Sequence, residues 1–149
     1  MARVVVSADY DAPPDRVWAV LEPVEDHVEW MADAEAIRFV TEQTRGVGTA
    51  FECDTRVGPL RVTDRLRITE WEPGRRMGVR HEGLVTGTGA FTLEPLDGGR
   101  RTRFTWEEEL IAPWWLGGRL TARVAGATVM RAIWRRNLNR LRPLVERAP

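Results

Sequence analysis

The sequence has no lysine. All 22 of its basic residues are arginine, and 22 acidic residues balance them to a formal net charge of zero. A chain without a basic surplus lacks the charge that holds a phosphate backbone, so we expect no nucleic-acid partner. We interpret the missing lysine as codon bias in a GC-rich genome and not as a sign of function.

Cysteine and long apolar runs are also scarce. Cys53 is the single cysteine, which excludes an intrachain disulfide and the paired spacings of a zinc site, so we expect neither a metal nor another cofactor. The apolar runs fall far short of the ~20 residues that span a bilayer, and the N-terminus lacks the apolar core of a signal peptide. These absences predict a cytoplasmic protein with no stable membrane insertion.

What the sequence does contain is enough apolar material for one core. With 149 residues, 43% of them hydrophobic, the chain is expected to form a single domain over residues 1–149. A first strand alternates from Val4 to Tyr10 and must stop at Pro13-Pro14, where two ladder donors are missing. Pro14 and Asp15 suit the first turn of a helix that follows.

The middle of the chain changes from helical to strand periodicity. A second short helix is predicted over residues 24–31, after Pro23, ending near Asp33. Beyond it, residues alternate by two in six segments, separated by glycine-containing turns that favour antiparallel neighbours. The alternating positions are Ile37/Phe39, Phe51/Cys53/Thr55, Val62/Asp64/Leu66/Ile68, Met77/Val79/His81, Phe91/Leu93 and Phe104/Trp106/Glu108/Leu110.

The C-terminal part is predicted to be one long amphipathic helix. Pro113 ends the strands, and apolar residues then recur every three or four positions from Leu116 to Val145. Gly126 permits close approach to this helix, and Pro143 is expected to kink or end it near Leu141. The arginines off the apolar stripe are interpreted as a solvated face.

In this order the elements give an α+β helix-grip fold, β-α-α-β6-α, with a seven-stranded curved antiparallel sheet wrapped around the long C-terminal helix. Short sequence features accompany this layout: Ala12-Pro13-Pro14-x-x-Val17-Trp18, Trp30, Val47-Gly48-Thr49, Trp71-Glu72-Pro73 and Gly99-Arg100-Arg101-Thr102. With the layout, they resemble the START-like (SRPBCC, Bet v 1-like) superfamily and, within it, the polyketide cyclase/dehydrase-type branch. The resemblance implies an internal cavity that takes a hydrophobic ligand such as a polyketide, lipid, quinone or plant-hormone-like molecule.

One feature departs from the aromatase/cyclases of that superfamily. The resemblance implies a cavity arginine at the strand end before the central turn, and the nearest position here is Trp71. Arg65 and Arg67 take the opposite parity from Leu66. Trp30, in contrast, matches a tryptophan near the pocket of such enzymes.

Three ionisable residues share the parity of the large apolar side chains. Asp64, His81 and Glu108 are therefore expected inside, as catalytic candidates. A carboxylate and an imidazole between apolar walls could remove a proton from a polyketide methylene or dehydrate an alcohol. The alternatives are that Asp64 pairs with an arginine, that Glu108 lies at the solvated mouth, and that His81 is a hydrogen-bonded structural residue. His27 is a weaker candidate.

The aromatic content favours a binding site. The expected ligand-binding residues are Trp30, Phe51, Thr55, Leu66, Trp71, Val79, Phe91, Trp106, Val124 and Ala127. About half of the aromatic residues are expected to serve packing alone. Trp114-Trp115 is interpreted as a gate of the cavity mouth or as a dimer contact.

Three functional hypotheses follow. The first is binding of a hydrophobic small molecule with cyclase or dehydratase activity. The second is a non-catalytic lipid or quinone carrier, and the third is a co-chaperone-like interaction module. Gly87-Thr88-Gly89 lacks the strand-to-helix setting of a phosphate loop, so nucleotide chemistry has little support. The sequence leaves open whether the protein forms a homodimer.

Overall fold

The computed structural model describes residues 2–111 and 119–147, with the backbone alone described for residues 2 and 119–126. Along the chain the elements are β1 (Ala2–Tyr10), α1 (Pro14–Leu21), η1 (Val24–Glu29), β2 (Ala34–Phe39), β3 (Ala50–Val57), β4 (Leu60–Glu72), β5 (Arg76–Glu82), β6 (Thr86–Leu96), η2 (Asp97–Gly99), β7 (Arg101–Ile111) and α2 (Arg119–Glu146). The strands form one seven-stranded antiparallel sheet in the order β1-β7-β6-β5-β4-β3-β2. The predicted architecture is confirmed.

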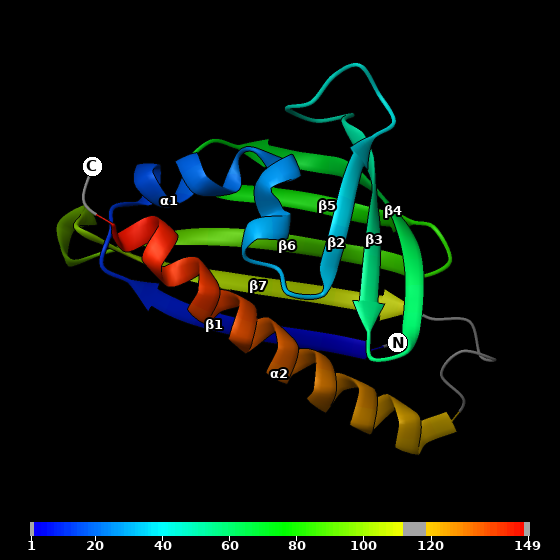
Figure 1. The fold of residues 1–149 in the computed structure, drawn as a ribbon. Helices are drawn as coiled ribbons and strands as arrows, with labels where there is room; N and C mark the ends of the chain where they lie inside the picture. The colour runs from blue at the N-terminus through cyan, green and yellow to red at the C-terminus, as the bar shows by residue number, and fades with distance from the viewer. Residues whose placement is uncertain (1, 112–118, 148–149) are drawn as a thin grey trace.

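The sheet is strongly twisted, and α2 crosses one of its faces (Figure 1). β2 and β3 run at a steep angle to β1 and β7 in this view, while α1 lies near the C-terminal end of α2. The face toward α2 is called the inner face below, and the opposite one the outer face. No helix of the described residues is long and apolar enough to cross a membrane.

The proline corner after β1 forms as the sequence predicts. β1 ends at Tyr10, Pro13 is the extended N-cap residue, and α1 begins at Pro14, where a missing N–H costs nothing. Val17, Trp18 and Leu21 are the buried residues of this helix. The corner therefore lays α1 across one end of the sheet.

The second short helix is shorter and tighter than expected. It was predicted over residues 24–31, whereas η1 is a 3₁₀ helix over Val24–Glu29. Its end is closed by a bond from the Trp30 amide to the His27 carbonyl, an i to i+3 link at 3.2 Å. Six residues are too few to sustain α-helical pairing without support from neighbours.

Of the two effects expected of Pro143, a kink or an end of the helix, the end is wrong, because α2 continues through the proline to Glu146. Leu141 and Val145, on either side of the proline, have no solvent exposure. Arg142 and Glu146 add an ion pair of 3.0 Å between Nη1 and Oε2. Burial of the last turn outweighs the one backbone bond that proline removes.

The C-terminal half of α2 is hydrogen-bonded to the last residue of β1 and to the segment just before β2. The Tyr10 hydroxyl donates to the Leu138 carbonyl at 2.7 Å, in a buried position. Asn137 is fully buried; its Nδ2 donates to Asp33 Oδ1 at 2.8 Å, and its Oδ1 accepts from the Ala32 amide at 2.9 Å. These bonds fix where α2 sits over the sheet.

Candidate functional site

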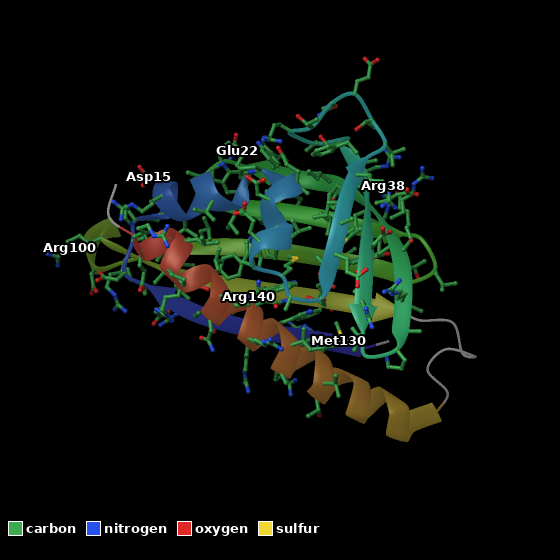
Figure 2. The ribbon with its side chains drawn as sticks, in the orientation of Figure 1. Asp15, Glu22, Arg38, Arg100, Met130 and Arg140 are labelled. Atoms are coloured by element: carbon green, nitrogen blue, oxygen red, sulfur yellow. The ribbon has the colours of Figure 1, made fainter. Side chains whose placement is uncertain are left out.

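Asp64, His81 and Glu108 meet on the inner face, although they come from three different strands. His81 on β5 is paired with Leu66 on β4, so Asp64 lies diagonally across from it. Glu108 is on β7, with β6 between it and β5. Figure 2 shows the contrasting outward position of Arg38 on β2, which projects away from α2.

The three side chains form a chain of contacts centred on the imidazole. His81 Nδ1 lies 2.5 Å from Asp64 Oδ2, and His81 Nε2 lies 3.4 Å from Glu108 Oε2. The exposed fractions are 6% for the His81 side chain, 16% for Asp64 and 12% for Glu108. Trp106 Nε1 donates to the other oxygen of Glu108 at 3.1 Å, which fixes the orientation of this carboxylate.

Gly89 explains how Glu108 reaches across β6. Gly89 is the partner of Glu108 in the β6–β7 register and of Val79 in the β5–β6 register. A Cβ at Gly89 would lie 2.9 Å from Glu108 Cγ and 3.0 Å from Oε1. Only glycine leaves this path open, so Glu108 lies over the bare backbone of β6 toward His81.

Gly87, two residues before Gly89, must also be glycine, but for a different reason. Its φ is +128°, and a Cβ there would lie 1.9 Å from the Glu109 carbonyl oxygen. This backbone is accessible to glycine alone. The Gly87-Thr88-Gly89 motif, which has no phosphate-loop setting, therefore shapes the space around the cluster.

The cluster holds His81 in its charged form. Burial alone would lower the pKa of this imidazole, but the hydrogen bond from Nδ1 to Asp64 and the nearby Glu108 carboxylate outweigh it and raise the pKa to about 10. The contact to Glu108 acts as an ion pair, because its geometry is not that of a hydrogen bond. At neutral pH the ring is an imidazolium.

Two buried polar atoms of the cluster have no hydrogen-bond partner among the described residues. They are Asp64 Oδ1 and His81 Nε2. Buried polar atoms are nearly always paired, so these two are available to a bound molecule. In the described part of the chain, no group of three or more His, Cys, Asp or Glu side chains is arranged to hold a metal ion.

Cys53 and Thr55 lie beside the cluster on β3. Cys53 is the register partner of Asp64, and its Sγ is 3.7 Å from Thr55 Oγ1. Burial raises the pKa of the Cys53 thiol to about 11. A neutral thiol is a poor nucleophile, so Cys53 serves as a wall of the site.

An aromatic cluster continues from the polar one toward α2. Trp106 stacks on Trp134 of α2 at 4.6 Å between ring centroids and 12° between planes. Trp30 and Phe91 both pack against Trp106, at 5.9 and 5.3 Å. Trp30 has no solvent exposure, and its Nε1 lacks a partner within the described residues.

The other expected ligand-binding residues are spread along the inner face of the sheet and, in the case of Ala127, on α2. Phe51 and Leu66 are buried and paired in register, and Thr55, Val79 and Ala127 are half-buried. The side chain of Val124 lies outside the described residues, as do Trp114 and Trp115.

Trp71 is the expected site residue that lies apart from the polar cluster. A register shift between Ile68 and Glu70 moves Trp71 onto the side of Met77, its partner on β5. Its ring packs edge-on against Trp18 of α1 at 5.2 Å. Trp71 therefore stands at the α1 end of the sheet, whereas His81 is at the far end of β5.

His27 is a structural residue. It is 5% exposed, and its Nε2 lies 2.7 Å from the Leu21 carbonyl oxygen. Burial lowers its pKa to about 4, so the ring is neutral at physiological pH. This position agrees with its rank as the weaker candidate.

Sequence reasoning missed two contributors to the site. Trp134 was recognised only as part of the helix stripe, and its stack on Trp106 depends on the three-dimensional placement of α2. The role of Gly89 was open to prediction, because pairing β6 with β7 through their short turn sets glycine opposite Glu108.

A surface groove lies away from this cluster, at the turn between β4 and β5. Its lining is Pro14, Glu72, Gly74, Arg75, Arg76, Thr92, Leu93, Glu94 and Pro95. None of the cluster residues belongs to it.

Solved structures share this fold at low sequence identity. The aromatase/cyclase Zhui of Streptomyces sp. R1128 superposes with a TM-score of 0.78 at 23% identity, covering 97% of this chain and 93% of the other. A protein of Thermus thermophilus gives 0.75 at 21%, covering 96% of each chain. A START superfamily protein of Mycobacterium smegmatis gives 0.75 at 12%, covering 98% of each.

Among curated proteins, no sequence matches this chain. The family model described as polyketide cyclase/dehydrase and lipid transport matches residues 1–146. The resemblance to the polyketide cyclase/dehydrase-type branch is thereby confirmed, and the chain belongs to the polyketide cyclase/dehydrase and lipid transport family.

Proposed function

We propose that the protein binds a hydrophobic molecule between the sheet and α2 and catalyses a dehydration on it. The observation that carries the proposal is the convergence of Asp64 and Glu108 on one buried imidazole at the inner face. The family and the likeness to an aromatase/cyclase support the reaction class. The aromatic cluster supplies flat apolar walls for the substrate.

His81 acts as the acid in this proposal. Its ring is charged at neutral pH because its pKa is raised to about 10. Asp64 orients the ring through Nδ1, and Nε2–H has no hydrogen-bond acceptor among the described residues. This N–H can therefore donate to the hydroxyl of a bound substrate.

Glu108 acts as the base. Trp106 holds one of its oxygens, and the other lies 3.4 Å from His81 Nε2. Glu108 removes a proton from the carbon beside a carbonyl while His81 protonates the leaving hydroxyl. The C–O bond breaks, a C=C bond forms and water departs. Transfer of the proton from Glu108 to Nε2 then restores both groups.

A model β-hydroxy ketone tests the proposal. The aldol adduct of acetone and naphthaldehyde is hydrophobic, and its dehydration gives a conjugated enone that is followed by absorbance. We expect the protein to accelerate this reaction and His81→Gln or Glu108→Gln to slow it by about 100-fold. Glu107→Gln is the matched control, because Glu107 faces outward and pairs with Arg3.

The outcome separates the enzyme from the carrier. Turnover that persists in Glu108→Gln and His81→Gln would contradict the assigned roles. Binding of the adduct without any acceleration by the wild-type protein would favour the carrier hypothesis. The interaction-module hypothesis depended on Trp114-Trp115, which lie outside the described residues, and on the arginines of the C-terminal helix.

From the sequence we further propose that residues 1–149 form one domain, that the protein is cytoplasmic and that it has no nucleic-acid partner. These proposals rest on the length of the sequence, on the single Cys53 and on its balanced charge.

A further inference from the structure

The polar cluster carries an excess of negative charge. It contains two carboxylates, Asp64 and Glu108, and one imidazolium, His81. The ion pairs of both carboxylates within the described residues are those with His81. One charge of the two is therefore left without a cation.

Arginines of the neighbouring strands cannot supply this cation, because they face outward. Arg65 on β4 is exposed, and Arg67 and Arg80 both pair with Glu82. The strand alternation that turns Asp64 and His81 inward turns these arginines away.

The remaining described groups around the imidazole are neutral. β3 contributes Cys53, whose burial keeps the thiol protonated by raising its pKa to about 11. β6 contributes Gly87 and Gly89, the register partners of His81 and Glu108. Trp106 on β7 gives one N–H to Glu108.

The cluster also has more acceptors than donors. Asp64 Oδ1 is buried and receives no hydrogen bond from the described residues. A carboxylate oxygen without a donor costs free energy when it is removed from water. A ligand that donates a hydrogen bond to Asp64 Oδ1 offsets this cost, whereas a ligand that brings a negative charge adds repulsion to it.

We propose that the ligand of this site is an apolar molecule that carries a hydroxyl or another hydrogen-bond donor and no negative charge. This inference rests on the proposed function, since it names the ligand class of the same site. Apolar carboxylic acids and phosphates are excluded by repulsion from Asp64 and Glu108, which is strong where water is displaced. Phenols and alcohols are accepted.

Three naphthalene probes of similar size test the class. β-Naphthol brings a donor, naphthalene brings none, and β-naphthoate brings a negative charge. Calorimetric titration at pH 7, with NMR of the His81 ring to place each probe, should show naphthol binding at least ~10-fold more tightly than naphthoate. Naphthalene should lie between them.

The Glu108→Gln variant tests whether charge sets this order. Removing one carboxylate leaves the cluster neutral, so the preference for naphthol over naphthoate should shrink by about 10-fold. Asp64→Asn is the second variant if Glu108→Gln fails to fold. Glu107→Gln should keep the wild-type preference, because Glu107 lies on the outer face.

The failures of the two proposals are distinguishable. If naphthoate binds as tightly as naphthol and shifts the His81 signals, the ligand class is wrong while the binding site stands. An unchanged preference in both inner-face variants would also overturn the class. If none of the probes binds, or if they bind without affecting His81, the proposed function itself fails.

Discussion

Glu107 and Glu108 are neighbours on β7 with opposite surroundings. The Glu107 side chain is 45% exposed and pairs with Arg3 on β1 at 3.0 Å. The Glu108 side chain is 12% exposed and lies beside an imidazole that is 6% exposed. One step along a strand thus separates a solvated ion pair from a buried charge cluster.

The outer and inner faces also differ in the cation they use. On the outer face carboxylates pair with arginine, as Asp54 does with Arg38, which together with Thr63 holds the pKa of Asp54 at about 2. On the inner face the described carboxylates pair with a histidine. A guanidinium is always charged, whereas an imidazolium can give up its proton. The cation of the inner-face cluster, His81, is therefore one that can release its proton, unlike the arginines of the outer face.

The largest contrast is expected between Glu108→Gln and Glu107→Gln. Glu108→Gln removes the buried ion pair between the Glu108 carboxylate and His81 Nε2, and we expect a loss of about 2 kcal/mol in the free energy of unfolding. Loss of the exposed Glu107 pair should cost less than about 1 kcal/mol. Urea unfolding followed by tryptophan fluorescence measures both. Equal losses would contradict the assignment of Glu108 to the cluster.

The pH dependence of stability sharpens the comparison. The folded-state pKa of His81 is about 10, above the ordinary value of about 6.5. Its contribution to stability is therefore complete below pH ~6.5 and is lost as the pH rises toward ~10. The Cys53 thiol, with a pKa of about 11, stays neutral through this range.

This pH dependence is checked by measuring the free energy of unfolding of the wild-type protein and of His81→Gln between pH ~6.5 and pH ~10. The wild-type protein should lose more stability than the variant as the pH rises. Parallel curves for the two proteins would show that the cluster does not hold the proton.

A smaller effect is expected from Gly89→Ala. The added methyl group meets the Glu108 side chain at about 3 Å, and the flexible carboxylate can swing aside. We expect the His81 pKa to fall by about one unit, which corresponds to a loss of about 1 kcal/mol in the free energy of unfolding at neutral pH. NMR titration measures this shift. Ala90→Ser, one residue along on the other face, should leave the pKa unchanged.

The strands and their faces could be predicted from the sequence because their alternation is regular. Asp64, His81 and Glu108 were placed inward by parity alone, and the register confirms that they share a face. That they touch could not be derived in the same way. The contact between His81 on β5 and Glu108 on β7 depends on Gly89, because a residue without a side chain on β6 lets Glu108 lie across that strand.

The errors arose where local rules met tertiary packing. The register shift between Ile68 and Glu70 sets the face on which Trp71 lies, and such a shift has no clear signal in one sequence. Pro143 did not end α2, because Leu141 and Val145 are buried around it. Helix propensity decides less than burial in the last turns of this helix.

The two histidines provide the most direct test of the account. Burial holds the pKa of His27 at about 4, while the two carboxylates raise that of His81 to about 10. Nitrogen-15 NMR of the imidazole rings between pH 5 and 9 should show a neutral His27 and a doubly protonated His81. A His81 ring that titrates near its ordinary value of about 6.5 would contradict the charged cluster on which the proposed reaction depends.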